Sequence, residues 1–312
     1  MKPPKSVVTV GSFDGVHLGH QLLVREVCRR AAAQSRAAVL VTFEPHPGSV
    51  LSPADAPHRL TVGVEQREIL AELGLDRLLV LRFNAAMAAM SAEQFVRTVL
   101  LQRCGMRELV IGVDAGFGRG RGGDSRTLPL LGARLGFDVA VVDTMRDDQG
   151  EVISSSRIRQ ALRTGELERA ARWLGRPYRI TGTVVPGAGR GRELGIHTIN
   201  LDGPPPEKAL PPDGVYAARV EWGGGPSGAM LNQGARPTVG ETRRSVEAHL
   251  FEFSGNLYGK TVRLEWVKRL REIRRFDSLD ALRQQLELDR EQALAVLGRL
   301  PLTSTARPIA AR

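Results

Sequence analysis

Two histidines directly after the first apolar run carry the clearest chemical pattern in the sequence. His17 and His20 stand three positions apart, just beyond the run at residues 7–10. On the first turn of a helix this spacing places both side chains on one face. A strand, a glycine turn and a helix start bring backbone N–H groups against phosphate, and imidazole donors suit the charge on a pentavalent phosphorus. The pattern predicts nucleotide chemistry; the alternative is a helix start that happens to contain two histidines.

The same turn supplies further candidates for ATP binding, namely Gly11, Phe13 and Gly19. Gly19 has no side chain, so a nucleotide could approach the backbone closely there.

A second group of polar residues precedes another predicted helix near the end of the same half. It consists of Ser155, Ser156, Arg157 and Arg159. Hydroxyl groups at a helix start and two guanidinium groups can bind a triphosphate. Taken alone, the group would be a helix cap with a solvated arginine. Together with the histidine pair, it predicts an ATP site.

Length and composition limit the class of protein. The chain has 312 residues, of which 42% are hydrophobic and 25% charged, which favours a globular protein of two domains. No apolar stretch is long enough for a membrane helix, and the first apolar run is too short for a signal peptide. We therefore expect a cytoplasmic protein without a membrane partner. Two cysteines, Cys28 and Cys104, exclude a disulfide scaffold.

The net charge is +10, from 44 basic and 34 acidic residues. Such a balance can indicate nucleic acid binding, but the basic residues are spread over both halves and only five are lysines. No basic run is interleaved with aromatic residues, so we do not expect a nucleic acid partner.

The first half alternates apolar runs with helical patterns. The predicted strands are residues 7–10, 37–43, 77–81, 108–113 and 137–142, and the predicted helices are residues 21–33, 64–73 and 92–101. Ser91 and Gln94 form a capping box before the last of these helices. Alternating strands and helices predict a Rossmann-like α/β domain with a parallel sheet, whose ligands bind at the carboxyl ends of the strands.

The second half has a different texture, with strands between glycine- and proline-rich turns. The predicted strands are residues 178–185, 214–222, 227–231, 245–253 and 260–268, followed by a helix over residues 279–297 that Asp277 or Ser278 caps. This pattern predicts a small β-barrel with a terminal helix. We expect an α/β domain over residues 1–175, a barrel domain over 176–300 and a tail over 301–312.

The N-terminal motifs resemble those of a known family. They are His-Leu-Gly-His at residues 17–20, Thr-Phe-Glu-Pro-His-Pro at 42–47 and Ser-Ser-Arg-Ile-Arg at 155–159. They look like the adenylyltransferase module of the bacterial bifunctional riboflavin kinase/FMN adenylyltransferases (FAD synthetases), within the nucleotidylyltransferase superfamily. The resemblance implies that FMN phosphate attacks the α-phosphorus of Mg·ATP, giving FAD and pyrophosphate. It also assigns the phosphates to His17, His20, Ser156 and Arg159, the region of the transferred group and metal to Asp114, and the flavin to Pro47 and Phe117.

The second half opens with a glycine-rich loop. Glycines and arginines can bind polyphosphate, and the candidates for ATP binding in this loop are Gly187, Arg190, Gly191, Arg192 and Gly195. The loop is not a Walker motif. Thr198 and Asn200 follow it and offer oxygen ligands that magnesium accepts. Glu247, in a predicted strand, could take a proton from an attacking alcohol; the alternative is an outward-facing strand residue paired with an arginine.

This stretch is similar to the riboflavin kinase module of the same family. The resemblance implies that Glu247 is the base that activates the terminal ribityl hydroxyl of riboflavin. It implies that Thr198 and Asn200 bind Mg²⁺ and ATP, and that Arg236 and Arg271 bind the flavin.

Several positions depart from the family pattern. The Pro-Thr-Ala-Asn motif has His197 and Ile199 in place of proline and alanine, Ala115 replaces one aromatic residue, and Ile273 replaces an acid. The residues expected to bind phosphate thus match the family pattern better than the residues expected to bind the flavin ring. Three alternatives follow: both activities on riboflavin and FMN; a diverged paralogue with only the adenylyltransferase active, or acting on a modified flavin or another heterocyclic phosphate; and a non-catalytic flavin- or nucleotide-binding regulator.

Overall fold

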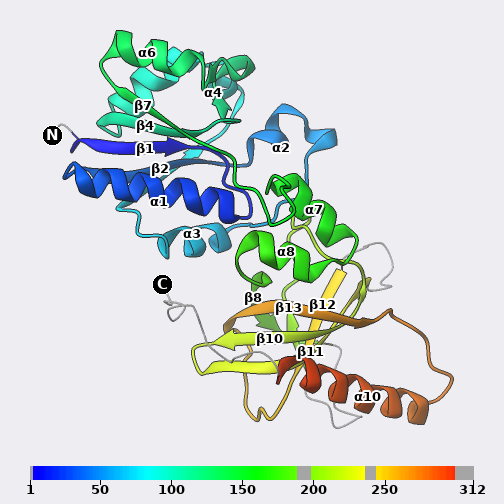
Figure 1. The fold of residues 1–312 in the computed structure, drawn as a ribbon. Coiled ribbons are helices and arrows are strands. Elements are labelled where there is room, and N and C mark those ends of the chain that lie inside the picture. Colours follow the sequence, from blue (N-terminus) through cyan, green and yellow to red (C-terminus); the bar gives the residue numbers. More distant parts are fainter. Residues whose placement is uncertain (1–2, 188–197, 236–243, 299–312) are drawn as a thin grey trace. The chain divides into compact units, whose positions relative to one another are not determined.

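A computed structural model describes residues 3–187, 198–235 and 244–298 of the chain (Figure 1). The chain divides into two compact units, Met1–Ser155 and Ser156–Arg312, and each is described by itself. The sequence places the boundary near residue 175, and the assignment of residues 156–175 to a functional domain stays a prediction. Within the part of the chain that is described, no helix is both long and apolar enough to cross a membrane.

The first unit is built on a five-stranded sheet in the order β3-β2-β1-β4-β7, and every neighbouring pair is parallel. The strands are β1 (Ser6–Val10), β2 (Ala37–Glu44), β3 (Arg77–Arg82), β4 (Met106–Gly112) and β7 (Asp138–Val142). The predicted parallel α/β fold is confirmed. The strand order reverses between β1 and β4, and in open α/β sheets ligands bind at the carboxyl ends of the strands at such a point.

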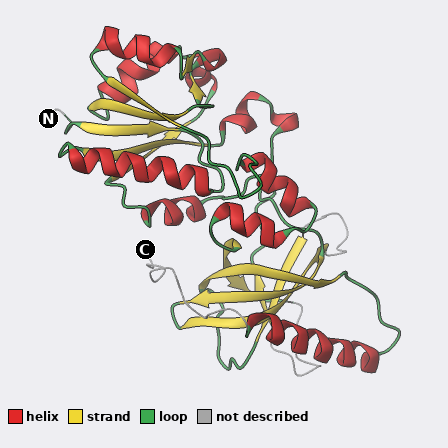
Figure 2. Cartoon of the chain, in the orientation of Figure 1, coloured by secondary structure: helices red, strands yellow, loops and turns green. Residues whose placement is uncertain are grey.

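Helices cover both faces of this sheet (Figures 1 and 2). Alternate residues of β1 serve the two faces: Val7 packs with α1 (Leu18–Ala33) and α3 (Val64–Ala71), whereas Val8 packs on the other side. That other face is covered by the segment from α4 to η2 and by α6. The elements there are α4 (Ala85–Ala89), α5 (Ala92–Phe95), η2 (Val96–Leu101) and α6 (Thr127–Leu135). The short elements α2 (Pro47–Leu51), η1 (Pro53–Asp55), β5 (Gly116–Phe117), η3 (Arg119–Arg121) and β6 (Gly123–Asp124) lie in the connections.

The predicted helix over residues 92–101 is only partly α-helical. Ser91 and Gln94 form the expected capping box, but the chain becomes a π-helix from Val96 to Leu101. The local signal therefore fixed the start of the helix correctly and did not determine its hydrogen-bond pattern.

The second unit is a closed six-stranded barrel in the order β10-β11-β12-β9-β8-β13. Its elements are α7 (Ser155–Arg163), α8 (Leu167–Leu174), β8 (Tyr178–Val185), β9 (Thr198–Leu201), β10 (Gly214–Trp222), β11 (Gly225–Ala235), β12 (Arg244–Leu250), β13 (Thr261–Arg271) and α10 (Leu279–Leu297). The predicted barrel with a terminal helix is confirmed. Two strand predictions need correction: β12 ends at Leu250 rather than at residue 253, and β9 is an additional strand.

The helix α10 covers one outer face of the barrel. Ser278 caps it, accepting the N–H of Ala281, as predicted. Val215 and Ala217 of β10 pack outward against Leu297 and its neighbours on α10, and the residue between them, Tyr216, is fully buried. The alternation along β10 thus divides an interior core from a face that holds α10.

Candidate functional site

The loop between β1 and α1 is held in place from a distant segment. Asp14 accepts the backbone N–H groups of Leu60 (2.9 Å) and Thr61 (3.1 Å), and the Thr61 hydroxyl accepts the N–H of Gly15 (3.0 Å). Phe13 and Val16 adopt positive φ angles of 49° and 40°, which is unfavourable for residues with a side chain. These hydrogen bonds fix an otherwise unfavourable backbone path at the carboxyl end of β1.

The histidine pair lies where this loop meets α1. His17 is the N-cap residue, and its Nδ1 accepts the N–H of His20 at 3.3 Å. That bond assigns the proton of a neutral His17 ring to Nε2, which is then the donor. The two imidazole rings stack with centroids 3.6 Å apart and planes 19° apart. The structure therefore brings together the two predicted catalytic histidines and orients one of them.

The three further candidates in this turn, Gly11, Phe13 and Gly19, lie close to the histidine rings or to one another. The Phe13 ring meets His20 edge-on, with centroids 5.1 Å apart. A Cβ atom on Gly19 would come within 3.2 Å of the His17 ring, and one on Gly11 within 3.1 Å of the Phe13 ring. Both glycines therefore leave room for a neighbouring ring: Gly19 for the imidazole of His17, and Gly11 for the ring of Phe13.

The start of α7 connects to this loop through Ser155. Its hydroxyl donates to the backbone carbonyl of Asp14 at 2.9 Å. The other members of the predicted serine–arginine group, Ser156, Arg157 and Arg159, belong to the second unit, where Arg159 donates to the Ser156 hydroxyl at 3.3 Å. Their contact with phosphates held by the histidines stays a prediction.

Asp114 follows β4, the neighbour of β1 in the sheet, and is exposed. Its carbonyl accepts a hydrogen bond from Arg121 at 2.7 Å. Asp114 thus lies at the carboxyl edge of the sheet, next to the strand that leads to the histidine pair.

A cluster of four phenylalanines lies in the first unit, and only Phe117 among them was predicted as a site residue. Its rings contact one another in a chain, with centroids 5.3 to 6.1 Å apart; the members are Phe43, Phe83, Phe95 and Phe117. Phe43 and Phe95 are buried, and Phe83 and Phe117 are partly exposed. Apolar and aromatic side chains are typical of pockets that hold flat rings. The four residues come from separate elements, so only the tertiary contacts of the folded unit reveal the cluster.

Pro47, the other predicted flavin residue of this unit, is the first residue of α2. His46 caps that helix by accepting the N–H of Gly48 at 3.0 Å. Proline at this position is favourable because its missing N–H would have no partner in the helix.

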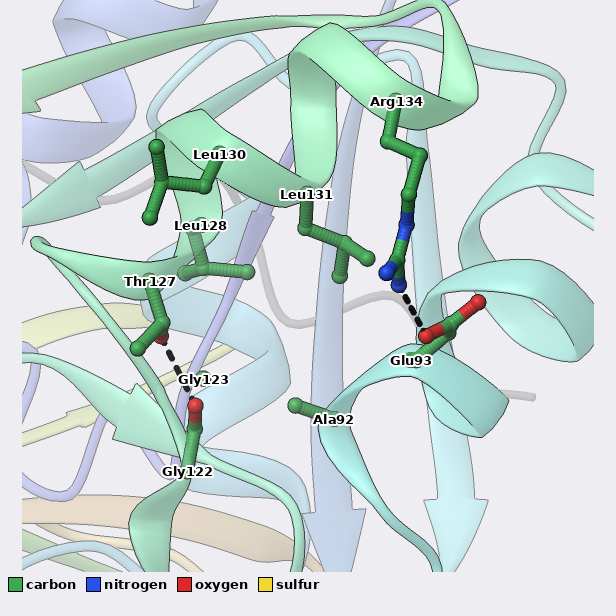
Figure 3. Close-up of a pocket in the computed structure, with 9 residues that line it drawn as sticks. All are labelled: Ala92, Glu93, Gly122, Gly123, Thr127, Leu128, Leu130, Leu131 and Arg134. Carbon is green, nitrogen blue, oxygen red and sulfur yellow. Dashed lines mark hydrogen bonds and ion pairs between the residues drawn. The ribbon is translucent and has the colours of Figure 1, made fainter.

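A surface pocket of about 250 Å³ lies between α5 and α6 (Figure 3). It contains none of the predicted site residues, and Glu93 and Arg134 form an ion pair across it. Because these two charged side chains are paired with each other, we assign no chemistry to this pocket.

Three of the predicted kinase residues, Thr198, Asn200 and Glu247, share one face of the barrel. Glu247 of β12 lies opposite Asn200 of β9 on one side and Asn232 of β11 on the other, and Thr198 lies opposite His249. Residues directly opposite on antiparallel strands share a face, as do residues two apart on one strand. The register therefore groups a carboxylate with hydroxyl and amide oxygens. Asn232 and His249 were not predicted as site residues, and only the register identifies them.

Gly187 lies directly against Asn200. A Cβ atom on Gly187 would overlap the side-chain amide of Asn200, so a larger residue there would displace that amide. Arg190, Gly191, Arg192, Gly195, His197 and Arg236 lie outside the described residues.

The oxygen groups of Thr198 and Asn200 fit a magnesium ion that also binds phosphate and water. Among the described residues there is no group of three or more histidine, cysteine or acidic side chains that could hold a metal by itself.

Arg271, the last residue of β13, is held by a carboxylate. Its guanidinium donates to Asp289 of α10, with the shortest bond at 2.7 Å. This residue was predicted to bind flavin, and the structure adds a partner that fixes its orientation.

An α/β sheet with an imidazole pair and a barrel with a carboxylate–amide face define a two-domain transferase that uses a nucleotide. Family models match each part: the FAD synthetase model matches residues 1–157 and the riboflavin kinase model residues 174–297. The chain is 36% identical over 291 residues to the bifunctional riboflavin kinase/FMN adenylyltransferase of Pseudomonas fluorescens, covering 93% of this chain and 92% of that protein. It is 35% identical to the Bacillus subtilis (strain 168) protein of the same name, covering 95% and 94%.

A solved structure from Streptococcus pneumoniae, named a macrolide-efflux protein, is 32% identical, with a TM-score of 0.85 over 94% of this chain and 95% of that one. The chain belongs to the bifunctional riboflavin kinase/FMN adenylyltransferase family.

Proposed function

We propose that this chain makes FAD from riboflavin in two steps, each in its own predicted domain. The barrel domain, residues 176–300, transfers the γ-phosphoryl group of ATP to riboflavin, giving FMN and ADP. The α/β domain, residues 1–175, then transfers the adenylyl group of a second ATP to FMN, giving FAD and pyrophosphate. Two separate groups of polar side chains support the proposal: the stacked pair His17 and His20 after β1, and Glu247 beside Asn200 on the barrel.

In the adenylyl transfer, a phosphate oxygen of FMN attacks the α-phosphorus of ATP, and the bond to pyrophosphate breaks. Negative charge grows on the oxygens of the α-phosphorus, and donors that are already oriented stabilise it without reorganising. His17 has its Nδ1 occupied by the His20 N–H, so its Nε2 is the group that donates. Ser155, Ser156, Arg157 and Arg159 would bind the remaining phosphates, and Asp114 would lie near the metal.

The flavin ring of FMN would bind near Pro47 and the four phenylalanines. Phe117 is partly exposed and packs on the buried Phe95, so it offers a supported face for stacking. This cluster favours an ordinary flavin as substrate, in spite of Ala115.

In the phosphoryl transfer, the terminal hydroxyl of riboflavin attacks the γ-phosphorus and ADP leaves. Glu247 would accept the hydroxyl proton, while Thr198 and Asn200 would hold Mg²⁺, which supplies charge neutralisation at the phosphates. Gly187, Arg190, Gly191, Arg192 and Gly195 would bind the polyphosphate, and Arg236 and Arg271 the flavin. Because ATP serves both steps, we place the enzyme in the cytoplasm, with residues 1–175 and 176–300 as its domains.

The test separates the two half-reactions. The protein is incubated with Mg·ATP and either riboflavin or FMN, and FMN, FAD, ADP and pyrophosphate are separated by chromatography. We expect FMN and ADP, then FAD, from riboflavin, and FAD and pyrophosphate from FMN. Turnover of FMN without turnover of riboflavin would favour the paralogue with one activity, and binding of flavin without any product would favour the regulator.

A further inference from the structure

Asp289, on the inner side of α10, is a fully buried carboxylate: its exposed fraction is 0%. Its oxygens accept three hydrogen bonds from Arg271, two from Nε at 2.9 and 3.0 Å and one from Nη2 at 2.7 Å. Gln285, one turn earlier on α10, adds a fourth at 2.7 Å. A buried carboxylate is costly unless it is paired and hydrogen-bonded. The hydrogen bonds to this carboxylate therefore hold the Arg271 guanidinium in one orientation.

The same guanidinium organises the connection that follows β13. Nη1 of Arg271 donates to the carbonyl of Glu272 at 2.9 Å. The ring of Phe276 lies 5.6 Å from the Arg271 guanidinium and 4.8 Å from that of Arg274. Asp289 thus acts, through Arg271, on both ends of the connection, at Glu272 and at Phe276.

This connection reaches the face of the barrel that carries Glu247. A Cβ atom on Gly234 would collide with the end of the Ile273 side chain, so Ile273 lies directly over Gly234. Gly234 lies opposite Ser245, and two residues along each strand Asn232 lies opposite Glu247. Positions two apart on a strand share a face. Ile273 and Glu247 are therefore neighbours on the same side of the sheet.

We propose that Asp289 is a positioning residue for riboflavin in the kinase reaction. It orients Arg271 and fixes residues 271–276 beside Glu247, so that the flavin is held while its terminal hydroxyl meets the base. Asp289 itself touches no substrate. This inference rests on the proposed kinase activity of the barrel. The simpler alternative is that the Asp289–Arg271 pair only fastens α10 to the barrel.

The test measures kinase kinetics for Asp289→Asn and Asp289→Glu in the full chain, with Arg271 either retained or changed to Lys. Asn keeps the shape of Asp but turns an amide toward the guanidinium, whereas Glu keeps the charge. Glu291→Gln, an exposed carboxylate on the same helix, is the control. Adenylyl transfer from FMN and thermal unfolding are measured on every variant.

We expect the KM for riboflavin to rise roughly ten- to a hundredfold in Asp289→Asn, because small displacements of a positioning group cost this much. The KM for ATP and the adenylyl transfer should stay unchanged, and Asp289→Glu should recover part of the loss. The effect of Asp289→Asn should vanish when Arg271 is Lys.

The inference would be overturned if Asp289→Asn left the KM for riboflavin unchanged, or raised the KM values for riboflavin and ATP equally. It would also be overturned if Asp289→Asn raised the KM for riboflavin by the same factor with Arg271 and with Lys at position 271. If Asp289→Asn does not fold, the same KM values for riboflavin and ATP are measured for Asp289→Glu with Arg271 and with Lys at position 271, and the same criteria apply. A wild-type protein that forms no FMN from riboflavin would instead refute the proposed kinase activity.

Discussion

The imidazole of His17 accepts the backbone N–H of His20 while the two rings stack 3.6 Å apart. One residue therefore caps α1 and at the same time presents a fixed donor at the carboxyl edge of the sheet. The cap and the chemistry can be separated by substitution.

His17→Asn and His17→Ala should lose adenylyl transfer alike and differ in stability. Both remove the imidazole donor, so FAD formation from FMN should fall by roughly 10²- to 10³-fold. Asn can still accept the His20 N–H, whereas Ala loses the cap, at a cost of about 1 kcal/mol. Rates are measured with FMN and Mg·ATP, and stability by urea unfolding. Retained adenylyl transfer in His17→Asn would show that the ring only caps the helix.

Gly187→Ala should damage the kinase and spare the adenylyltransferase. The added methyl group overlaps the Asn200 amide, and overpacking of this kind costs about 1 to 3 kcal/mol. We expect the KM for ATP in FMN formation to rise by at least about tenfold. Gly203→Ala, which has open space around it, is the matched control. An unchanged KM for ATP in Gly187→Ala would remove Gly187 and Asn200 from the nucleotide site.

Phe117→Ala should weaken FMN binding in the adenylyltransferase. The Phe117 ring packs on Phe95 with centroids 5.3 Å apart, and an aromatic contact with a flat ligand contributes about 1 kcal/mol beyond the area it buries. The KM for FMN should rise several-fold while the KM for ATP stays constant. Leu130→Ala, in the pocket of Figure 3, should change neither value. A larger effect of Leu130→Ala than of Phe117→Ala would place the flavin in that pocket instead.

Glu26 should make the first unit depend on pH in the acid range. Hydrogen bonds from Arg29 and Arg30 and the charges of both lower the pKa of Glu26 from 4.5 to about 2. Because the folded pKa is depressed, the contribution is fully present above pH 4.5 and is lost as the pH falls toward 2. Glu26→Gln should be less stable by about 1 kcal/mol at pH 7, and the difference should disappear near pH 2.

That comparison uses the free energy of unfolding measured from pH 7 to 2, with Glu72→Gln as an exposed control. A difference between Glu26→Gln and the wild type that stays constant over the whole range would contradict the lowered pKa.

Much of the first unit could be predicted from local sequence signals. Short apolar runs between helical patterns identified all five strands of the sheet, and the capping box at Ser91 marked a true helix start. The change to a π-helix at Val96 has no counterpart in the capping signals.

Local signals in the barrel are less informative. The sequence identifies Thr198 and Asn200 as oxygen ligands and does not predict β9, which lies between β12 and β8 in the barrel. From sequence spacing, Glu247 could equally be an outward-facing strand residue paired with an arginine. Only the register, which places Glu247 between Asn200 and Asn232, shows its polar neighbours. The phenylalanine cluster and the Asp289–Arg271 pair likewise depend on contacts between distant segments.

The proposed function requires two independent active sites in this chain. The most direct measurement compares Glu247→Gln with His17→Asn in both half-reactions under one set of conditions. We predict that Glu247→Gln forms FAD from FMN at the wild-type rate and forms no FMN from riboflavin, and that His17→Asn does the reverse. The proposed function would be contradicted if either variant, still folded, lost both reactions. It would also be contradicted if both variants kept both reactions.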